Sequence, residues 1–432
     1  MYINALLKNR KIIISNLICE TVIFFFIFNI FDNFQKIIIL IFFFFISYIL
    51  GKYDLIFPID RKLFQVYVLK YFVLFFLNFI FYYFTYSLVN LKINYQFFLI
   101  LFSKFLILNL LSQLVINKTF FRSNQNSKIW LAFINDDEKK ELDNYVKRQN
   151  NTCRQKINLF HFKNIKKHDV KKFEGLIVDL DLIKKNKDYD KYINKNKKLI
   201  FFSTLDWCNY YLEFLPVSLL NKYCHKIQFL QKYKSKYYFL FKKFGDIFIS
   251  TLLIIVTSPL MFLVCILIKI EDGGPILYSQ KRTGLNLKIF KIYKFRSMKV
   301  DAEDFGIQWS TRRDPRITKV GKFIRLTRID ELPQLISVIK GEMSLIGPRP
   351  ERPEINESLF KETEFFKYRY LIKPGLSGWA QVNYNYAASK EESIKKLGYD
   401  MYYLKNCSFL LDILIIFKTM KLILNLKGAL PN

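Results

Sequence analysis

Long apolar runs alternate with short polar breaks over the first 120 residues of the chain. Four of these runs approach the roughly 20 residues that an α-helix needs to cross a bilayer core. They predict membrane helices at Ile12–Phe31, Lys36–Leu50, Val66–Val89 and Gln96–Ile116. The alternative, a very hydrophobic soluble helical bundle, fits runs of this length less well. A cleavable signal peptide is not expected, because the first run lacks a small-residue cleavage site and further runs follow it.

Basic residues border these runs at alternating ends. They precede the first run, separate the second from the third and follow the fourth: Lys8, Arg10, Lys11, Lys52, Arg61, Lys62, Lys118 and Arg122. The other two connections are poor in lysine and arginine. Because basic residues are retained on the cytoplasmic side, both ends of residues 1–120 are expected in the cytoplasm.

From residue 121 to 243 the composition is that of a globular domain. Short apolar runs alternate with charged stretches of helical length such as Asp136–Arg148, a pattern typical of an α/β layer with a parallel sheet. The expected strands are Ile129–Ile134, Ile157–Phe162, Leu176–Leu180 and Leu199–Phe202. No GxGxxG motif follows the first of them, so dinucleotide binding is not expected.

A further apolar segment, Phe244–Ile270, is interrupted by Ser258 and Pro259. Proline has no N–H and its ring meets the carbonyl four residues earlier, so a helix must bend or break there. Two interpretations remain open: a kinked fifth span, or a helix that enters one leaflet and returns. Lysines at both ends of the segment, and the expected cytoplasmic position of the residues beyond it, favour the return.

The chain beyond this segment predicts a small α+β domain. Ile276–Gln280 and Leu287–Tyr293 resemble a strand pair joined at Lys281–Gly284. Near the end, Phe409–Leu426 is apolar with interspersed charges, so we expect an amphipathic helix that lies in the membrane interface. A sixth span is the weaker interpretation because of those charges.

Adjacent carboxylates at Asp330 and Glu331 stand just ahead of Pro333. Apolar residues follow at the i, i+3, i+4, i+7 spacing of one helix face: Leu332, Leu335, Ile336 and Ile339. The pair is therefore expected at a helix start. In isolation such a pair is most often an N-capping acid with solvated basic neighbours.

The chain carries 67 Lys+Arg against 36 Asp+Glu, a formal charge of +31, yet 52% of its residues are hydrophobic. A basic soluble protein would suggest nucleic acid. Here the long apolar runs make anionic membrane lipids the expected partner, and no nucleic-acid partner is expected. The six cysteines show no CxxC spacing and the three histidines no ligand pattern, which argues against a disulfide framework, a cysteine or histidine metal cluster, and histidine catalysis.

Seven stretches of the last 190 or so residues carry a resemblance, in this order: DIFISTLLIIVTSPLMF, GGPILYSQKRTG, FKIYKFRSM, the Asp330-Glu331 segment, SLIGPRPERPE, KPGLSGWAQVN and YDMYYLKN. Together they resemble the bacterial sugar transferases, polyprenyl-phosphate hexose-1-phosphate transferases of the large form. After the four transmembrane helices expected from the apolar runs (1–120), the resemblance implies a Rossmann-like α/β domain (121–243) and a C-terminal α+β catalytic domain (244–432). That catalytic domain would sit on a re-entrant helix (244–270) broken at Ser258-Pro259, with the amphipathic helix 409–426 near its end.

The resemblance also implies a reaction, the transfer of hexose-1-phosphate from a UDP-sugar to undecaprenyl phosphate with release of UMP. Attack on a diphosphate needs a cation, basic groups on the phosphates and a positioned oxygen nucleophile. A carboxylate can act as that nucleophile and form an acyl phosphate. The resemblance assigns this role to Asp330. Asp330 and Glu331 are expected to hold Mg²⁺, a hard cation suited to carboxylate and phosphate oxygens, and the alternative for Glu331 is to assist proton and charge management.

Other residues of the matching stretches are candidates for binding phosphate, sugar or metal: Lys294, Arg296, Arg325, Arg349 and Asp400. Arg349 lies on a stiff turn between two prolines, where a plain surface arginine is the alternative. We expect only one of Lys294 and Arg296 to face the site. Asp400 either completes the site or caps the following helix. Trp379 either stacks on a base or, as we expect, packs in the core.

By the same resemblance, the protein lies in the bacterial inner membrane as a multi-pass protein whose catalytic domain faces the cytoplasm. It would start exopolysaccharide, capsule or O-antigen (lipopolysaccharide) synthesis, with homo-oligomers and downstream glycosyltransferases as expected partners. One rival is a catalytically silent scaffold for glycan enzymes. The other is a membrane sensor or transporter, which an expected near-absence of buried charge in the first four runs disfavours. No residue identifies the sugar.

Overall fold

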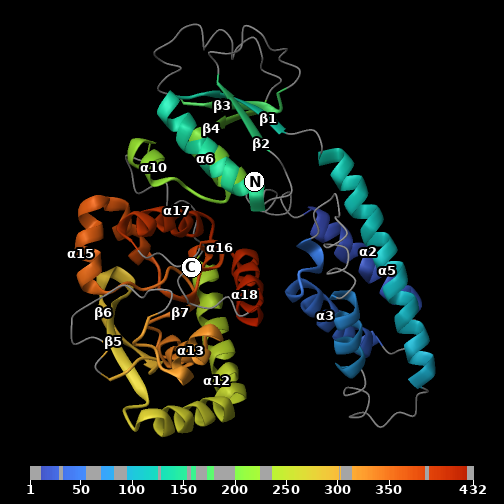
Figure 1. Cartoon of the computed structure of the whole chain (residues 1–432). Coiled ribbons are helices and arrows are strands. Elements are labelled where there is room, and N and C mark those ends of the chain that lie inside the picture. The colour runs from blue at the N-terminus through green and yellow to red at the C-terminus, as the bar shows by residue number, and fades with distance from the viewer. Residues whose placement is uncertain are drawn as a thin grey trace. The chain divides into compact units, whose positions relative to one another are not determined.

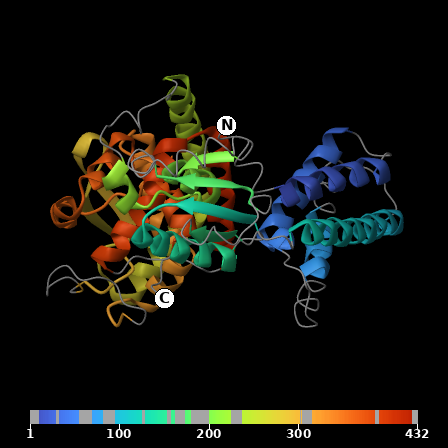
Figure 2. The same cartoon turned by 90° about the horizontal axis from the view of Figure 1, so that it is seen from above.

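The computed structural model of the protein describes residues 11–28, 33–54, 70–81, 95–124, 128–152, 157–161, 173–179, 200–223, 236–300, 302, 314–384 and 389–425. These residues form two compact units, Met1–Leu212 and Glu213–Asn432. Figures 1 and 2 show the elements of each unit from two directions. The division into three domains at residues 120 and 243 stays a prediction.

The N-terminal unit begins with helices at the four predicted places: α2 (Lys11–Ile27), α3 (Asn33–Ile49), a helix at Lys70–Phe81, and α5 (Tyr95–Asn124). Phenylalanine rings fill the core between them: Phe24, Phe28, Phe43, Phe102 and Phe105. Within α5, Leu99–Ile116 is long and apolar enough to cross a membrane, while the other three helices are shorter in the part of the chain that is described. Four membrane crossings therefore stay a prediction.

An ion pair is buried among these helices. The side chains of Glu20 and Lys52 are 1% and 2% exposed, and Lys52 Nζ lies 2.8 Å from Glu20 Oε1 and 2.5 Å from Asn109 Oδ1. Tyr53 donates to Glu20 Oε2 at 2.6 Å, and the Lys52 ammonium lies 4.7 Å from the Phe43 ring centroid. The expectation of almost no buried charge is therefore wrong. It was wrong because Glu20 lies inside the first apolar run and is buried there, and because Lys52, just after the second run, is buried with it rather than in a solvated loop. A near-absence of buried charge therefore does not count against a transport role.

A parallel sheet completes the N-terminal unit, as predicted. Its strands are β1 (Lys128–Phe133), β2 (Ile157–His161), β3 (Gly175–Val178) and β4 (Ile200–Ser203), in the order β2-β1-β3-β4. All three pairings are parallel. Helix α6 (Asp136–Thr152) follows β1, and the short helices α9 (Thr204–Trp207) and η4 (Cys208–Leu212) follow β4. Residues 162–172 and 180–199 lie outside the described residues, so a Rossmann-like domain stays a prediction.

The C-terminal unit contains the long helix α12 (Lys236–Asp272), which begins eight residues before the predicted segment. Pro259 lies inside it, and Figure 1 shows the helix turning sharply partway along its length. Thr257 and Ser258 donate to the carbonyls of Leu253 and Ile255 at 2.7 and 2.8 Å, so hydroxyls supply donors beside the proline. The predicted break is thus a bend within one helix, and the re-entrant path stays a prediction.

Many apolar side chains along α12 are exposed on the surface of the protein. Tyr237–Asp272 is the second segment, among the described residues, that is long and apolar enough to span a membrane. Phe248, Ile255, Phe262 and Ile270 are 64% to 75% exposed. An exposed apolar surface of this size marks a contact with a membrane or another protein, and the length and composition of the segment suit a membrane.

The rest of this unit is a compact α+β fold around two small sheets. Strands β5 (Leu277–Thr283) and β6 (Ile289–Phe295) form an antiparallel pair, joined through η5 (Leu285–Leu287), and β7 (Ser344–Ile346) pairs with β8 (Gly375–Ser377) in parallel. The prediction that Lys281–Thr283 form the connection was wrong, because β5 runs through them. The helices are α10 (Val217–Tyr223), α13 (Lys319–Leu326), η6 (Ile329–Gln334), α14 (Leu335–Ile339), α15 (Pro353–Glu362), η7 (Glu364–Leu371), α16 (Trp379–Asn383), α17 (Lys390–Asn406) and α18 (Phe409–Leu424).

Both arms of α12 are anchored to this fold. Val264 and Ile268 pack with Phe295 and Ile324 in one buried cluster. At the other arm, Asp412 of α18 accepts hydrogen bonds from three groups of α12 and α17: Tyr238, Lys242 and Tyr403. The helix predicted at 409–426 is therefore present, although its position in a membrane interface stays a prediction.

Candidate active site

The carboxylate pair lies in a 3-10 turn, η6, rather than at the first turn of an α-helix. Arg328, just before it, has a positive φ of 60°, a conformation that costs a non-glycine residue free energy and is enriched at functional sites. Helix α14 begins only at Leu335 and has five residues. Its predicted apolar face was wrong in part, since Ile336 and Ile339 are 45% and 39% exposed.

Three cations surround the carboxylate of Glu331. Lys294 Nζ and Arg349 Nη2 donate to its Oε1 at 2.9 and 2.8 Å, and Arg328 Nη1 donates to its Oε2 at 3.1 Å. Burial by itself would raise the pKa of Glu331, but Arg349, Lys294 and Arg328 together hold it well below its usual value. Glu331 is therefore ionised throughout the neutral range.

Asp330 is nearly as buried, at 6% exposed, but its pKa is shifted in the opposite direction. Its Oδ1 is fully covered and accepts no hydrogen bond from any residue that the structure describes. Burial, followed by the neighbouring charge of Glu331, raises the pKa of Asp330 to about 6. Lys294, Arg328 and Arg325 act in the other direction. One oxygen of Asp330 is thus buried without a hydrogen-bond donor in the described residues.

Lys294 and Arg296 have separate surroundings, as expected. Lys294 is the penultimate residue of β6 and lies opposite Tyr278 on the same face of the hairpin. Arg296 comes after the last residue of β6, where strand pairing has ended, and its Nη2 donates to Asp272 at the end of α12. Gly274 permits this, since a Cβ there would lie 2.4 Å from Arg296 Nη1. Lys294 therefore belongs to the carboxylate site, while Arg296 joins α12 to the sheet.

Arg349 reaches Glu331 from the turn between β7 and α15, so it is no isolated surface arginine. Arg325 lies on the last turn of α13, close enough to lower the pKa of Asp330. Asp400, in contrast, is inside α17, where Arg369 Nε lies 2.8 Å from its Oδ2. The capping alternative for Asp400 was wrong, since Ser408 caps the next helix, α18. Trp379 packs in the core as expected, at 1% exposed.

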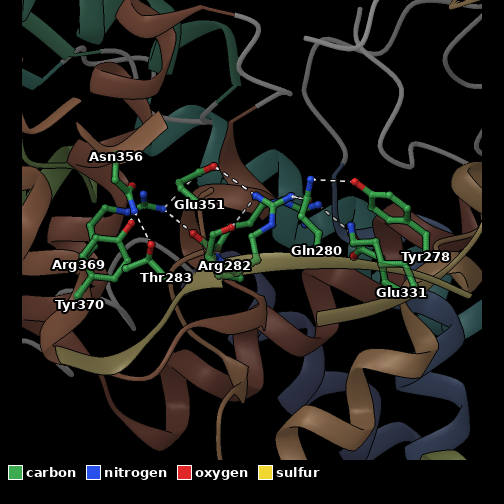
Figure 3. Close-up of polar contacts among 12 residues, drawn as sticks. Tyr278, Gln280, Arg282, Thr283, Glu331, Glu351, Asn356, Arg369 and Tyr370 are labelled. Carbon is green, nitrogen blue, oxygen red and sulfur yellow. Dashed lines mark hydrogen bonds and ion pairs between the residues drawn. The ribbon is translucent and has the colours of Figure 1, made fainter. Parts of the chain in front are cut away.

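A second group of charges, absent from the predicted site, lies beside the carboxylate pair. Figure 3 shows Arg369, Glu351, Arg282, Gln280 and Tyr278 along β5, leading toward Glu331. The alternation of β5 could have revealed part of it, because Tyr278, Gln280 and Arg282 are two residues apart and share one face. Arg328 was visible as a basic neighbour, but its left-handed backbone was not. Arg369 and Glu351 gave no usable signal, since their elements meet only in the tertiary fold.

The carboxylate oxygens of this site could supply only part of the coordination of Mg²⁺. Both oxygens of Glu331 are engaged by cations, whereas Asp330 Oδ1 is a hard oxygen without a hydrogen-bond donor in the described residues. No cluster of three or more histidine, cysteine or acidic residues suited to a metal occurs in the described part of the chain. Mg²⁺ is commonly held by one or two carboxylates together with substrate phosphates. The arrangement therefore suits a magnesium ion that shares its coordination with a bound diphosphate.

Comparison with known proteins identifies the family of the domain that carries this site. A family model described as bacterial sugar transferase matches residues 237–426. The exopolysaccharide production protein PSS of Rhizobium leguminosarum bv. phaseoli is 37% identical over 185 residues, which cover 41% of this chain and 92% of that protein. This chain belongs to the bacterial sugar transferase family. The family match contains α12 except its first residue, and all the elements that carry the carboxylate site.

Two longer members of the sugar transferase family are also similar. The UDP-N-acetylgalactosamine-undecaprenyl-phosphate N-acetylgalactosaminephosphotransferase of Aeromonas hydrophila is 45% identical over 205 residues, 48% of each chain. The UDP-glucose:undecaprenyl-phosphate glucose-1-phosphate transferase of Escherichia coli (strain K12) is 39% identical over 182 residues, 42% of this chain and 39% of that protein. The chain thus matches less than half the length of these two relatives.

Proposed function

We propose that this protein transfers a sugar-1-phosphate from a UDP-sugar to undecaprenyl phosphate and releases UMP. Two relatives are named as transferases that use an undecaprenyl-phosphate acceptor, and one is named for exopolysaccharide production. The observation that carries the proposal is the pair of unlike carboxylates, because both oxygens of Glu331 are paired with cations while Asp330 Oδ1 has no hydrogen-bond donor in the described residues. The product would start the assembly of an exopolysaccharide, capsule or O-antigen.

Asp330 is the proposed nucleophile. One carboxylate oxygen forms a bond to the β-phosphorus of the UDP-sugar, the bond from that phosphorus to the bridging oxygen breaks, and UMP leaves with the electron pair. An oxygen of the lipid phosphate then attacks the same phosphorus and releases the Asp330 carboxylate. A carboxylate that is buried and short of hydrogen bonds is poorly stabilised as an anion, which favours bond formation to an electrophile.

The cations around Glu331 would bind the diphosphate. Lys294, Arg328 and Arg349 supply three positive charges against two carboxylates, so the site keeps an excess of one positive charge when both acids are ionised. Glu331 orients these side chains, and each has further N–H donors for phosphate oxygens. Positioned cations of this kind stabilise charge as it moves to the leaving group. Mg²⁺, when bound through Asp330 and the diphosphate, would neutralise further charge there.

The surroundings of the site suit a lipid acceptor. Helix α12 has an exposed apolar surface and packs on α13 and β6 next to the carboxylate turn. We infer that α12 is re-entrant at Pro259 in the inner membrane, and that the site faces the cytoplasm near the lipid headgroups. A soluble UDP-sugar and a membrane-held phosphate could then meet at Asp330.

Steady-state transfer tests this proposal. The full chain in detergent or lipid would be incubated with Mg²⁺, undecaprenyl phosphate and a panel of UDP-sugars, and both UMP and lipid-linked sugar phosphate would be measured. Turnover by the wild type, lost in Asp330→Asn, is expected, and the active donor identifies the sugar. If no donor gives turnover, and Asp330→Asn still supports glycan synthesis in cells, the protein acts instead as a scaffold for glycan enzymes.

A further inference from the structure

The turn that carries Arg349 has few backbone N–H donors. Pro348 and Pro350 have no N–H groups, so this segment can be fixed mainly through its carbonyl oxygens. All three carbonyls are in fact engaged. Pro348 accepts from Gly375 N at 2.9 Å, Arg349 accepts from Arg369 Nη2 at 2.8 Å, and Pro350 accepts from Arg282 Nη1 at 3.1 Å.

The donors come from three separate elements. Gly375 begins β8, Arg369 lies in η7 and Arg282 lies in β5. A cluster of elements that meet only in the tertiary fold therefore fixes the position of the Arg349 backbone. Figure 3 shows Arg282 and Arg369 on either side of Glu351.

Arg369 is held more tightly than a surface arginine. It is 2% exposed, its Nε lies 2.8 Å from Asp400 Oδ2, and its guanidinium lies 4.6 Å from the Phe366 ring centroid. Glu351 Oε1 is 3.7 Å from its Nη2. The Asp400 and Glu351 carboxylates and the Phe366 ring surround this guanidinium and leave it little rotational freedom. Its hydrogen bond to the Arg349 carbonyl therefore restricts the position of that carbonyl.

We propose that Arg369 is a positioning residue that acts through Arg349, holding its backbone so that its guanidinium stays on Glu331 beside Asp330. The inference rests on the proposed function, since it assigns Arg369 a part in that reaction. Asp400 and Phe366 fix Arg369, Arg369 fixes the Arg349 carbonyl, and Arg349 Nη2 reaches Glu331 Oε1 at 2.8 Å. Asp400 thus serves the site indirectly.

A double-mutant cycle tests this chain of contacts. Turnover of the full chain would be measured for wild type, Arg369→Met, Arg349→Ala and the double variant. Two residues that act through one contact are not additive, so Arg369→Met should lower kcat about tenfold alone but less than about twofold when Arg349 is already alanine. Arg316→Met is the matched control, because Arg316 also pairs with an aspartate, Asp314, and donates to a carbonyl, that of Ala302.

Thermal unfolding of each variant separates positioning from loss of fold. If Arg369→Met does not give folded protein, Arg369→Lys takes its place, because one lysine nitrogen cannot replace both Nε and Nη2. Equal losses in the two Arg349 backgrounds, or an equal loss in Arg316→Met, would overturn the positioning role while leaving the proposed function standing. A wild-type protein without turnover under any condition would overturn both.

Discussion

Each of the two units of this protein buries carboxylates, and the carboxylates differ in their hydrogen-bond and ion-pair partners. In the N-terminal unit, both oxygens of Glu20 accept hydrogen bonds, from Lys52 and Tyr53, and Lys52 also donates to Asn109. In the C-terminal unit, Glu331 is paired with three cations while Asp330 Oδ1 has no donor in the described residues. The N-terminal group has one cation for one carboxylate. The C-terminal group has three cations for two carboxylates, and one oxygen of Asp330 has no hydrogen-bond donor in the described residues.

The difference separates a packing interaction from a reactive site. A buried ion pair whose hydrogen bonds are met holds neighbouring helices in one arrangement and contributes little beyond that. A buried carboxylate without its hydrogen bonds costs stability, so it persists only where something else depends on it. Burial of charge alone would mark both groups as functional sites, whereas Asp330 is the carboxylate of these two groups that has an oxygen without a hydrogen-bond donor in the described residues.

The largest expected effect on transfer activity comes from replacing the Asp330 carboxylate. Asp330→Asn should lower transfer activity by at least about 10³-fold, because an amide is a far poorer nucleophile than a carboxylate. The same change should leave the thermal unfolding temperature unchanged or higher, since it removes an ion that is costly to bury. Activity assays and thermal unfolding on one preparation check both. A variant that lost activity and stability together would instead point to a structural role.

The next effect comes from removing one cation of the excess. Arg349→Ala should lower kcat/KM about 10²-fold, the usual loss when one preorganised donor to a developing charge is removed. Arg349→Lys provides the graded control, because it keeps the charge but loses the two-pronged geometry, and it should fall between alanine and wild type. Kinetics with varied UDP-sugar measure this. Equal activity of all three would show that Arg349 does not contact the substrate.

Breaking the Glu20–Lys52 ion pair should change the stability of the protein and leave its transfer activity unchanged. Lys52→Met leaves Glu20 buried without its cation, which should lower the free energy of unfolding by about 2 kcal/mol. The transfer rate of the protein that remains folded should not change. Lys104→Met, at an exposed position of α5 in the same unit, is the matched control and should have little effect. Loss of transfer activity without loss of stability would assign the Glu20–Lys52 pair a functional role.

The smallest effect expected is on the pH dependence. The pKa of Asp330 is raised to about 6, and its nucleophilic form is the carboxylate. Activity should therefore fall about tenfold per pH unit as the pH drops below 6. The stability follows the opposite sign, since an acid with a raised pKa in the folded state stabilises the fold at low pH and loses that contribution as the pH rises through about 6. A pH–rate profile with its acidic limb near pH 4 would contradict this.

Much of the architecture could be predicted from local pattern. The four apolar helices, the parallel strands and the bend at Pro259 follow from run length, alternation and proline chemistry. The pair Asp330-Glu331 and the partners Lys294 and Arg349 were selected by resemblance, and the structure brings all four together. What failed depends on tertiary context: Lys52 is buried only because other helices surround it, and the 3-10 turn at Asp330 follows a left-handed Arg328 that no pattern encodes.

The central claim, that Asp330 reacts covalently, is tested most directly without an acceptor. Wild type and Asp330→Asn would be mixed with Mg²⁺ and the active UDP-sugar in the absence of polyprenyl phosphate, and released UMP and intact protein mass would be recorded. A stoichiometric burst of UMP with a sugar-phosphate mass adduct, absent from the variant, is the predicted result. Turnover that requires the lipid, with neither burst nor adduct before it is added, would contradict the claim and indicate direct transfer between the two substrates.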